Sequence, residues 1–220
     1  MHIGLIGGIG PAATDFYYRN LIRIASETGR KLELTIAHAD SPPLLKNLSA
    51  NDEDAQCAIF LGLTDRLQKA GAENVVVTSI AGHFCIDRFA ERSPLPVIDL
   101  TKEVSAWLND KGMKRVGIMG TETVMRSGMY GKLTSVEVIA PDEGTINNVH
   151  EAYVTLARTG EPTDALRAIF VAAADAMMAR GAEAILLGGT DLNAAFDAET
   201  APFPIVDCAG IHVDAIARQI

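Results

Sequence analysis

The feature that most constrains the fold of this sequence is an internal repeat. In the first half, AGAE leads into NVVVTSIAGHF and later into SPLPVIDL, and in the second half RGAE leads into AILLGGTDLNAAF and later into APFPIVDC. The spacing is also the same, because Gly71 precedes Ser79 by as many residues as Gly181 precedes Gly189. The segments MHIGLIGG and MKRVGIMGTE correspond as well. Three matching blocks in one order predict two structurally equivalent lobes.

Short apolar runs alternate with amphipathic stretches along the whole chain. Continuous apolar strands separated by helices are typical of parallel sheets covered on both faces. We therefore expect an α/β fold of two pseudo-symmetric lobes, each a mostly parallel sheet flanked by helices. Strands are expected at residues 3–6, 32–37, 74–78, 97–99, 116–119, 136–139, 184–187 and 205–207, and helices at 12–28, 53–70, 148–158 and 161–180.

The repeat places the lobe boundary near residues 99–112. We expect the first lobe over residues 1–100 and the second over 101–204. The last segment, from about 205 to 220, is expected to pack back onto the first lobe, because a repeat ends where it began.

Composition excludes several classes of protein. The 220 residues are 48% hydrophobic and 21% charged, with a net charge of −9, so no basic surface for nucleic acid or an anionic membrane is expected. No apolar run has the ~20 residues of a membrane span. The cysteines are Cys57, Cys85 and Cys208. Their odd number and the lack of metal-ligand spacing favour a reducing, cytoplasmic setting. Cys85 and Cys208 are predicted to be small core residues. The histidines form no metal-binding motif, and no metal site is expected.

The repeat also indicates where a ligand would bind. In open α/β sheets, ligands lie beyond the carboxyl ends of the strands. If the two lobes face each other, the equivalent strand ends at Ser79 and Gly189 lie across one cleft.

A glycine-rich loop follows the first strand and opens a helix. Gly10 and its neighbours permit close approach of a ligand to backbone N–H groups, which bind carboxylate or phosphate at a helix start. A plain tight turn is the alternative. A dinucleotide-binding loop is less favoured, because the glycine spacing differs from GxGxxG and Pro11 interrupts it.

The loop after the first repeated strand contains Ser79, Ile80, Ala81 and His83. Small residues here leave room for a ligand and offer backbone donors, which makes Ile80 and Ala81 candidate binding residues. His83 is a candidate base for activating Ser79, although no hydrolase motif surrounds the pair. The alternative is a structural histidine that is hydrogen-bonded to the other lobe.

The matching loop of the second lobe contains Gly189, Thr190 and Asp191. Asp191 is a candidate catalytic carboxylate or a helix cap. Thr121 and Thr123, after the first strand of the second lobe, either hold a ligand carboxylate or cap a loop.

Two cations are candidates for binding a ligand carboxylate. These are Lys46 and Arg158, and for each the alternative is a solvated surface charge. Arg158 also precedes a helix end, where a cation is favoured in any case.

Several motifs together resemble the aspartate/glutamate racemase family. They are GLIGGIGPAAT, SGMY at 127–130, PDEG at 141–144, ARTG at 157–160, GAEAILLGGTDL and PIVDCAGIH. The resemblance covers nearly the whole chain in order. It implies two lobes with one catalytic cysteine from each, no pyridoxal phosphate or other cofactor, and a homodimer.

The chain departs from this family where the resemblance implies the two cysteines. Those positions are Ser79 and Gly189. Two thiols can remove the α-proton and return one on the opposite face, but a serine hydroxyl is a weak acid and glycine has no side chain. Lys46 and Arg158 match basic positions of the family, which implies that a carboxylate still binds.

The leading hypothesis is therefore an amino-acid racemase of this family that binds a small acidic amino acid or carboxylic acid between its lobes. One alternative is a lyase, isomerase or decarboxylase at the same cleft, using Asp191, His83 or Ser79. A second alternative is a relative that binds its ligand without catalysis.

Overall fold

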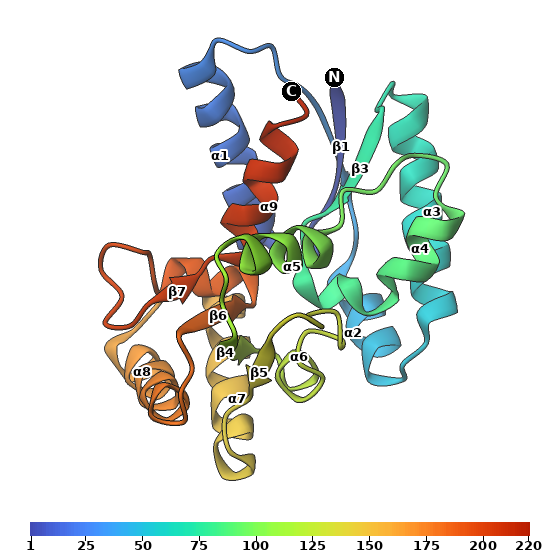
Figure 1. The fold of residues 1–220 in the computed structure, drawn as a ribbon. Coiled ribbons are helices and arrows are strands. Elements are labelled where there is room, and N and C mark those ends of the chain that lie inside the picture. Colours follow the sequence, from blue (N-terminus) through green and yellow to red (C-terminus); the bar gives the residue numbers. More distant parts are fainter. The chain divides into compact units, whose positions relative to one another are not determined.

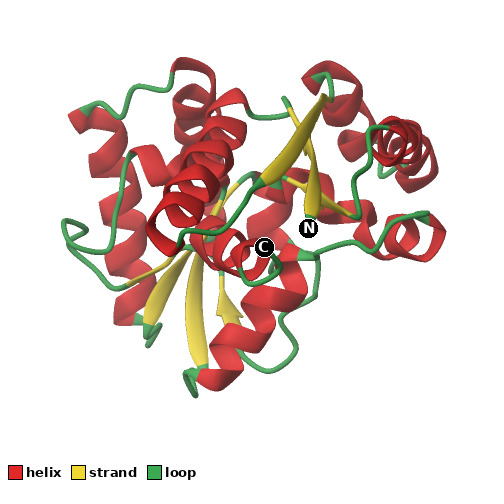
Figure 2. Ribbon diagram, turned by 90° about the horizontal axis from the view of Figure 1, so that it is seen from above, coloured by secondary structure: helices red, strands yellow, loops and turns green.

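A computed structural model describes all 220 residues, and the chain divides into two compact units. Unit 1 comprises Met1–Leu100 with His212–Ile220, and unit 2 comprises Thr101–Ile211. Each unit is built around a parallel sheet flanked by helices, as Figure 2 shows. The structure contains no helix that is both long and apolar enough to cross a membrane.

Unit 1 contains a three-stranded parallel sheet in the order β2-β1-β3. Helix α3 lies on one face of this sheet, and α1 lies with the end of α9 on the other (Figure 1). The elements are β1 (His2–Gly7), α1 (Pro11–Thr28), β2 (Glu33–His38), α2 (Ser41–Ser49), α3 (Glu53–Lys69), β3 (Asn74–Val77), η1 (Ile80–Cys85) and α4 (Ile86–Arg92).

Unit 2 contains a four-stranded parallel sheet in the order β5-β4-β6-β7. Its helices α7 and α8 pack against each other beside the sheet. Its elements are β4 (Arg115–Gly120), α6 (Glu122–Arg126), β5 (Glu137–Ile139), α7 (Glu143–Thr159), α8 (Asp164–Ala179), β6 (Ala184–Gly188), η2 (Thr190–Ala194) and β7 (Ile205–Val206). Helices α5 (Leu100–Asp110) and α9 (Cys208–Ala217) begin in one unit and end in the other.

The two units repeat the same backbone, which confirms the predicted internal repeat. Gly71 and Gly181 both adopt left-handed conformations, with φ of 94° and 92°, where a side chain would be strained. Ser79 (φ −140°, ψ 123°) and Gly189 (φ −143°, ψ 124°) have nearly identical dihedral angles at the starts of η1 and η2. The predicted α/β fold with two similar parallel-sheet lobes is therefore correct.

Several details of the sequence-based prediction are wrong. Residues 97–99 form a single bridge between Val97 and Val75 instead of a strand. Residues 205–206 pair with β6 inside unit 2, so the segment that returns to unit 1 begins at His212 and not near 205. The pattern also missed helices α2, α5, α6 and α9. In α2, Pro42 and Pro43 obscure the helical pattern, although proline is tolerated in the first turn of a helix.

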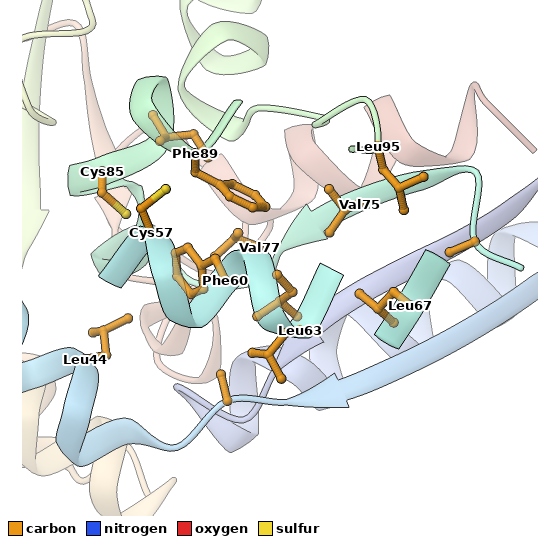
Figure 3. Close-up of a cluster of buried hydrophobic side chains, with 14 residues drawn as sticks. Leu44, Cys57, Phe60, Leu63, Leu67, Val75, Val77, Cys85, Phe89 and Leu95 are labelled. Carbon is orange, nitrogen blue, oxygen red and sulfur yellow. The ribbon is translucent and has the colours of Figure 1, made fainter. Parts of the chain in front are cut away.

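The core of unit 1 lies between α3 and the sheet. Figure 3 shows Phe60 of α3 and Phe89 of α4 inside this cluster, and both are fully buried. Their rings meet edge to face, with centroids 5.4 Å apart. Cys57 and Cys85 belong to the same cluster.

Unit 1 also buries two histidines, His83 and His212. The Nε2 atom of His212 donates to the carbonyl of Ile98 at 2.8 Å, so its Nδ1 atom accepts a hydrogen bond from the Tyr17 hydroxyl at 2.8 Å. Burial, with the neighbouring His83 adding to the effect, lowers the pKa of His212 to about 3. The imidazole is therefore neutral in the folded protein.

This histidine makes stability depend on pH. Between its ordinary pKa of 6.5 and its folded-state pKa of about 3, His212 binds a proton in the unfolded chain but not in the folded one. His212 is therefore expected to lower the free energy of unfolding as the pH drops below 6.5, by up to about 1.4 kcal/mol per pH unit. Burial also lowers the pKa of His83, which adds to the fall. Urea titrations between pH 7 and pH 5 measure this slope.

His212→Gln is expected to reduce that slope, because glutamine does not titrate. The same substitution at the exposed His38 is the control and is expected to leave it unchanged. Equal slopes in His212→Gln and the wild-type protein would contradict the assignment.

Candidate functional site

The carboxyl end of β6 is followed by a buried carboxylate that is paired with a tyrosine. Asp191 lies in η2, directly after this strand, and only 6% of it is exposed. Its Oδ2 atom accepts a hydrogen bond of 2.9 Å from the hydroxyl of Tyr153 in α7. Its Oδ1 atom is buried and has no hydrogen-bond partner.

Burial determines the titration of both groups in this pair. Burial raises the pKa of Asp191, and the hydrogen bond from Tyr153 opposes that rise. Burial and the charge of Asp191 raise the pKa of Tyr153 well above its ordinary value. Tyr153 therefore remains a protonated donor, while Asp191 is a stronger base than an exposed carboxylate.

The packing around Gly189 explains why this position has no side chain. A Cβ atom there would lie 2.2 Å from Cε2, 2.5 Å from Cζ and 2.8 Å from the hydroxyl oxygen of Tyr153. The tyrosine ring thus occupies the space that a side chain of residue 189 would need.

Sequence reasoning did not single out Tyr153. Its signal is weak, because Tyr153 continues the apolar face of α7 with Ile146, Val149 and Leu156 and reads as a core residue. Its hydroxyl is the only polar side-chain group among these four residues.

In unit 1, Ser79 occupies the equivalent strand end and is 7% exposed. His83 is fully buried, and its Nδ1 atom donates to the backbone carbonyl of Ser79 at 2.7 Å. This bond joins His83 to the backbone of Ser79 and not to its hydroxyl, so the structure does not support the predicted Ser79–His83 pair. The bond also lies within unit 1, which differs from the alternative of a histidine bonded to the other lobe. Burial lowers the pKa of His83 and keeps it neutral.

Other predicted residues lie in these two loops and in the segment after β4. Ile80 and Thr190 are buried at the starts of η1 and η2, and Ala81 is partly buried. The hydroxyl oxygen of Thr121 caps α6 by accepting from the N–H of Val124 at 3.3 Å, which favours the capping interpretation. Thr123 is exposed.

The glycine-rich loop forms the start of α1, with Gly10 as its N-cap. An open pocket of about 280 Å³ lies beside it, lined in part by Gly7, Gly8 and Thr14. The hydroxyl of Thr14 donates to the carbonyl of Gly10 and accepts from the N–H of Gly8, so the loop satisfies part of its own polar backbone.

The two predicted cations are exposed. Lys46 lies in the last turn of α2. Arg158 lies in the last turn of α7, five residues after Tyr153. Because an α-helix turns ~100° per residue, Arg158 points roughly 140° away from Tyr153.

All three cysteines are buried, which confirms the predicted core positions of Cys85 and Cys208. Burial raises the pKa of all three thiols, to about 12 for Cys85. None is poised as a thiolate. No group of three or more histidine, cysteine, aspartate or glutamate side chains is arranged to hold a metal ion.

Comparison with known proteins identifies relatives of the whole chain. Residues 6–216 match the sequence model of the Asp/Glu/Hydantoin racemase family. A Yersinia pestis protein, provisionally called an Asp/Glu racemase, is 25% identical, with a TM-score of 0.86 over 100% of this chain and 99% of that one.

Two further solved structures share the fold. An aspartate racemase homologue from Pyrococcus horikoshii OT3 has a TM-score of 0.83 at 22% identity, over 99% of this chain and 98% of its own. The aspartate racemase of Picrophilus torridus has a TM-score of 0.79 at 18% identity, over 100% of this chain and 94% of its own.

Proposed function

Because the chain belongs to the Asp/Glu/Hydantoin racemase family, we propose that it transfers the α-proton of a small acidic amino acid or carboxylic acid, without pyridoxal phosphate. The reaction class is that of an amino-acid racemase, an isomerase. The observation that carries the proposal is Asp191, a buried carboxylate with one oxygen held by Tyr153 and the other without a partner.

In the proposed step, Oδ1 of Asp191 takes the α-proton of the substrate. The electron pair of the broken C–H bond moves into the substrate carboxylate, which becomes an enediolate. For inversion, a second acid or a water molecule then delivers a proton to the opposite face of the α-carbon, and the enediolate electrons form the new C–H bond. Asp191 releases the first proton to solvent, so nothing is oxidised or reduced. A base of raised pKa suits this step, because α-protons are weakly acidic and proton transfer improves as the two pKa values approach.

The proposed substrate class comes from the relatives. Two of the similar structures are an aspartate racemase and an aspartate racemase homologue. An α-amino dicarboxylic acid is therefore the first substrate to test.

The direct test is to incubate the protein with L- or D-aspartate or glutamate in D₂O. Loss of the α-proton signal by NMR, at a rate proportional to protein concentration, is the expected result. Chiral chromatography of the same samples separates exchange with retention from inversion. Retention indicates that one base both removes and returns the proton, and inversion requires a second donor on the opposite face.

Two other outcomes would overturn the proposal. A new product without α-proton exchange would indicate a lyase or decarboxylase. Thermal stabilisation by these acids with neither exchange nor product would indicate a binding protein without catalysis.

A further inference from the structure

Tyr153 and a side chain at residue 189 compete for the same space in unit 2. A Cβ atom on Gly189 would lie 2.2 Å from Cε2 of Tyr153, well inside van der Waals contact. Tyr153 is only 8% exposed and is packed on the buried face of α7, so the ring has little room to retreat. The position of the Tyr153 ring therefore requires that residue 189 has no side chain.

The far end of the same ring fixes the orientation of Asp191. The Tyr153 hydroxyl donates to Oδ2 of Asp191 at 2.9 Å. The other oxygen of this carboxylate, Oδ1, has no hydrogen-bond partner. A buried polar atom without a partner is rare in folded proteins and needs an explanation. A proton-accepting role in a ligand complex would provide one.

We propose that Tyr153 is the positioning residue of Asp191, and that this tyrosine–aspartate pair replaces the second cysteine that the family resemblance implies at residue 189. This inference rests on the proposed function for its catalytic meaning. The phenol stays protonated throughout and holds Oδ2. The α-proton is then exchanged at Oδ1, the carboxylate oxygen that the phenol does not hold.

The pair also sets the pH at which the base works. A hydrogen bond to the ionised carboxylate favours that form, so Tyr153 opposes the effect of burial on Asp191. Without the hydroxyl, Asp191 would remain protonated to a higher pH. The ring alone, as in phenylalanine, would preserve the packing around Gly189.

The test is Tyr153→Phe, measured over a pH series of α-proton exchange. Loss of one hydrogen bond to a carboxylate is expected to move the acidic limb of the profile to higher pH by about one pH unit. At a fixed pH on that limb, the rate falls about tenfold. Val154→Thr is the control in the same helix, because Val154 is exposed, and its profile is expected to match the wild type.

A merely structural role for Tyr153 predicts a different result, namely a lower plateau rate with the limb in its original place. That outcome would overturn the inference.

A second measurement does not depend on activity. The side-chain carboxyl carbon of Asp191, observed by ¹³C NMR, is expected to titrate at higher pH in Tyr153→Phe than in the wild type. If the wild type catalyses no exchange, the proposed function fails, but this titration still decides whether Tyr153 controls Asp191. An identical titration in both proteins would overturn the pairing.

Discussion

The Asp191→Asn variant is expected to lose α-proton exchange by a factor of about 10² to 10⁴, the range over which a positioned general base accelerates proton transfer. Asparagine has nearly the same shape and keeps an oxygen that can accept from the Tyr153 hydroxyl. It cannot accept the α-proton as a carboxylate does. The measurement is the rate of loss of the α-proton signal in D₂O, compared with the wild type at equal protein concentration.

Asp175→Asn is the matched control. Asp175 is an exposed aspartate on α8 of the same unit, and this variant loses the same charge away from Tyr153. Its exchange rate is expected to equal that of the wild type. Full exchange in Asp191→Asn would contradict the role of Asp191, whatever the activity of the control.

The Gly189→Cys variant is expected to lose roughly 1–3 kcal/mol of stability, the usual cost of placing an extra side chain in a well-packed region. The new Cβ atom would meet the ring of Tyr153 at 2.2 Å, so the ring must move. Its movement would also disturb the hydrogen bond to Asp191. Urea denaturation measures the loss of stability, and the exchange assay measures the loss of activity.

The chain contains its own control for this substitution. Ser79 has nearly the same backbone dihedral angles as Gly189 and already carries a side chain. Ser79→Cys exchanges one side-chain atom for a larger one and adds no new Cβ atom, so it is expected to cost less stability than Gly189→Cys. Equal stabilities of Gly189→Cys and the wild type would contradict the steric argument.

Removal of the tyrosine ring should relieve the clash. In the double variant Gly189→Cys with Tyr153→Ala, the loss of stability is expected to be smaller than the sum of the two single losses. A protein with cysteines at both strand ends is therefore a fair test of thiol chemistry only if Tyr153 is also replaced. Additive losses would indicate that the two side chains do not compete.

The sequence predicted the α/β class and the repeat because both leave a local signal. Continuous apolar strands such as β1 and β4 are typical of parallel sheets with two covered faces. The equivalence of Ser79 and Gly189 follows from spacing alone, and the matching dihedral angles confirm it. The bridge at Val97 was mistaken for a strand, because a short apolar run carries no information on its partners.

The candidate site was predictable only in part. Asp191 could be found, since it follows a repeated strand end where ligands bind in α/β sheets. The sequence could not decide whether Asp191 is a helix cap or a base, because its role depends on its burial and on the hydrogen-bond partner of each carboxylate oxygen. His83 was assigned a hydroxyl partner by proximity in sequence, whereas its ring bonds the backbone carbonyl of Ser79.

The sequence by itself thus determined that this protein has two equivalent parallel-sheet units with a marked position at the end of one strand in each. It also determined that neither marked position carries a thiol. Only the tertiary structure decided what stands near Gly189, because Tyr153 comes from a helix more than thirty residues earlier in the chain. Protein interiors are closely packed, so a side chain from another element fills the space beside Gly189. A local sequence pattern does not show which side chain that is.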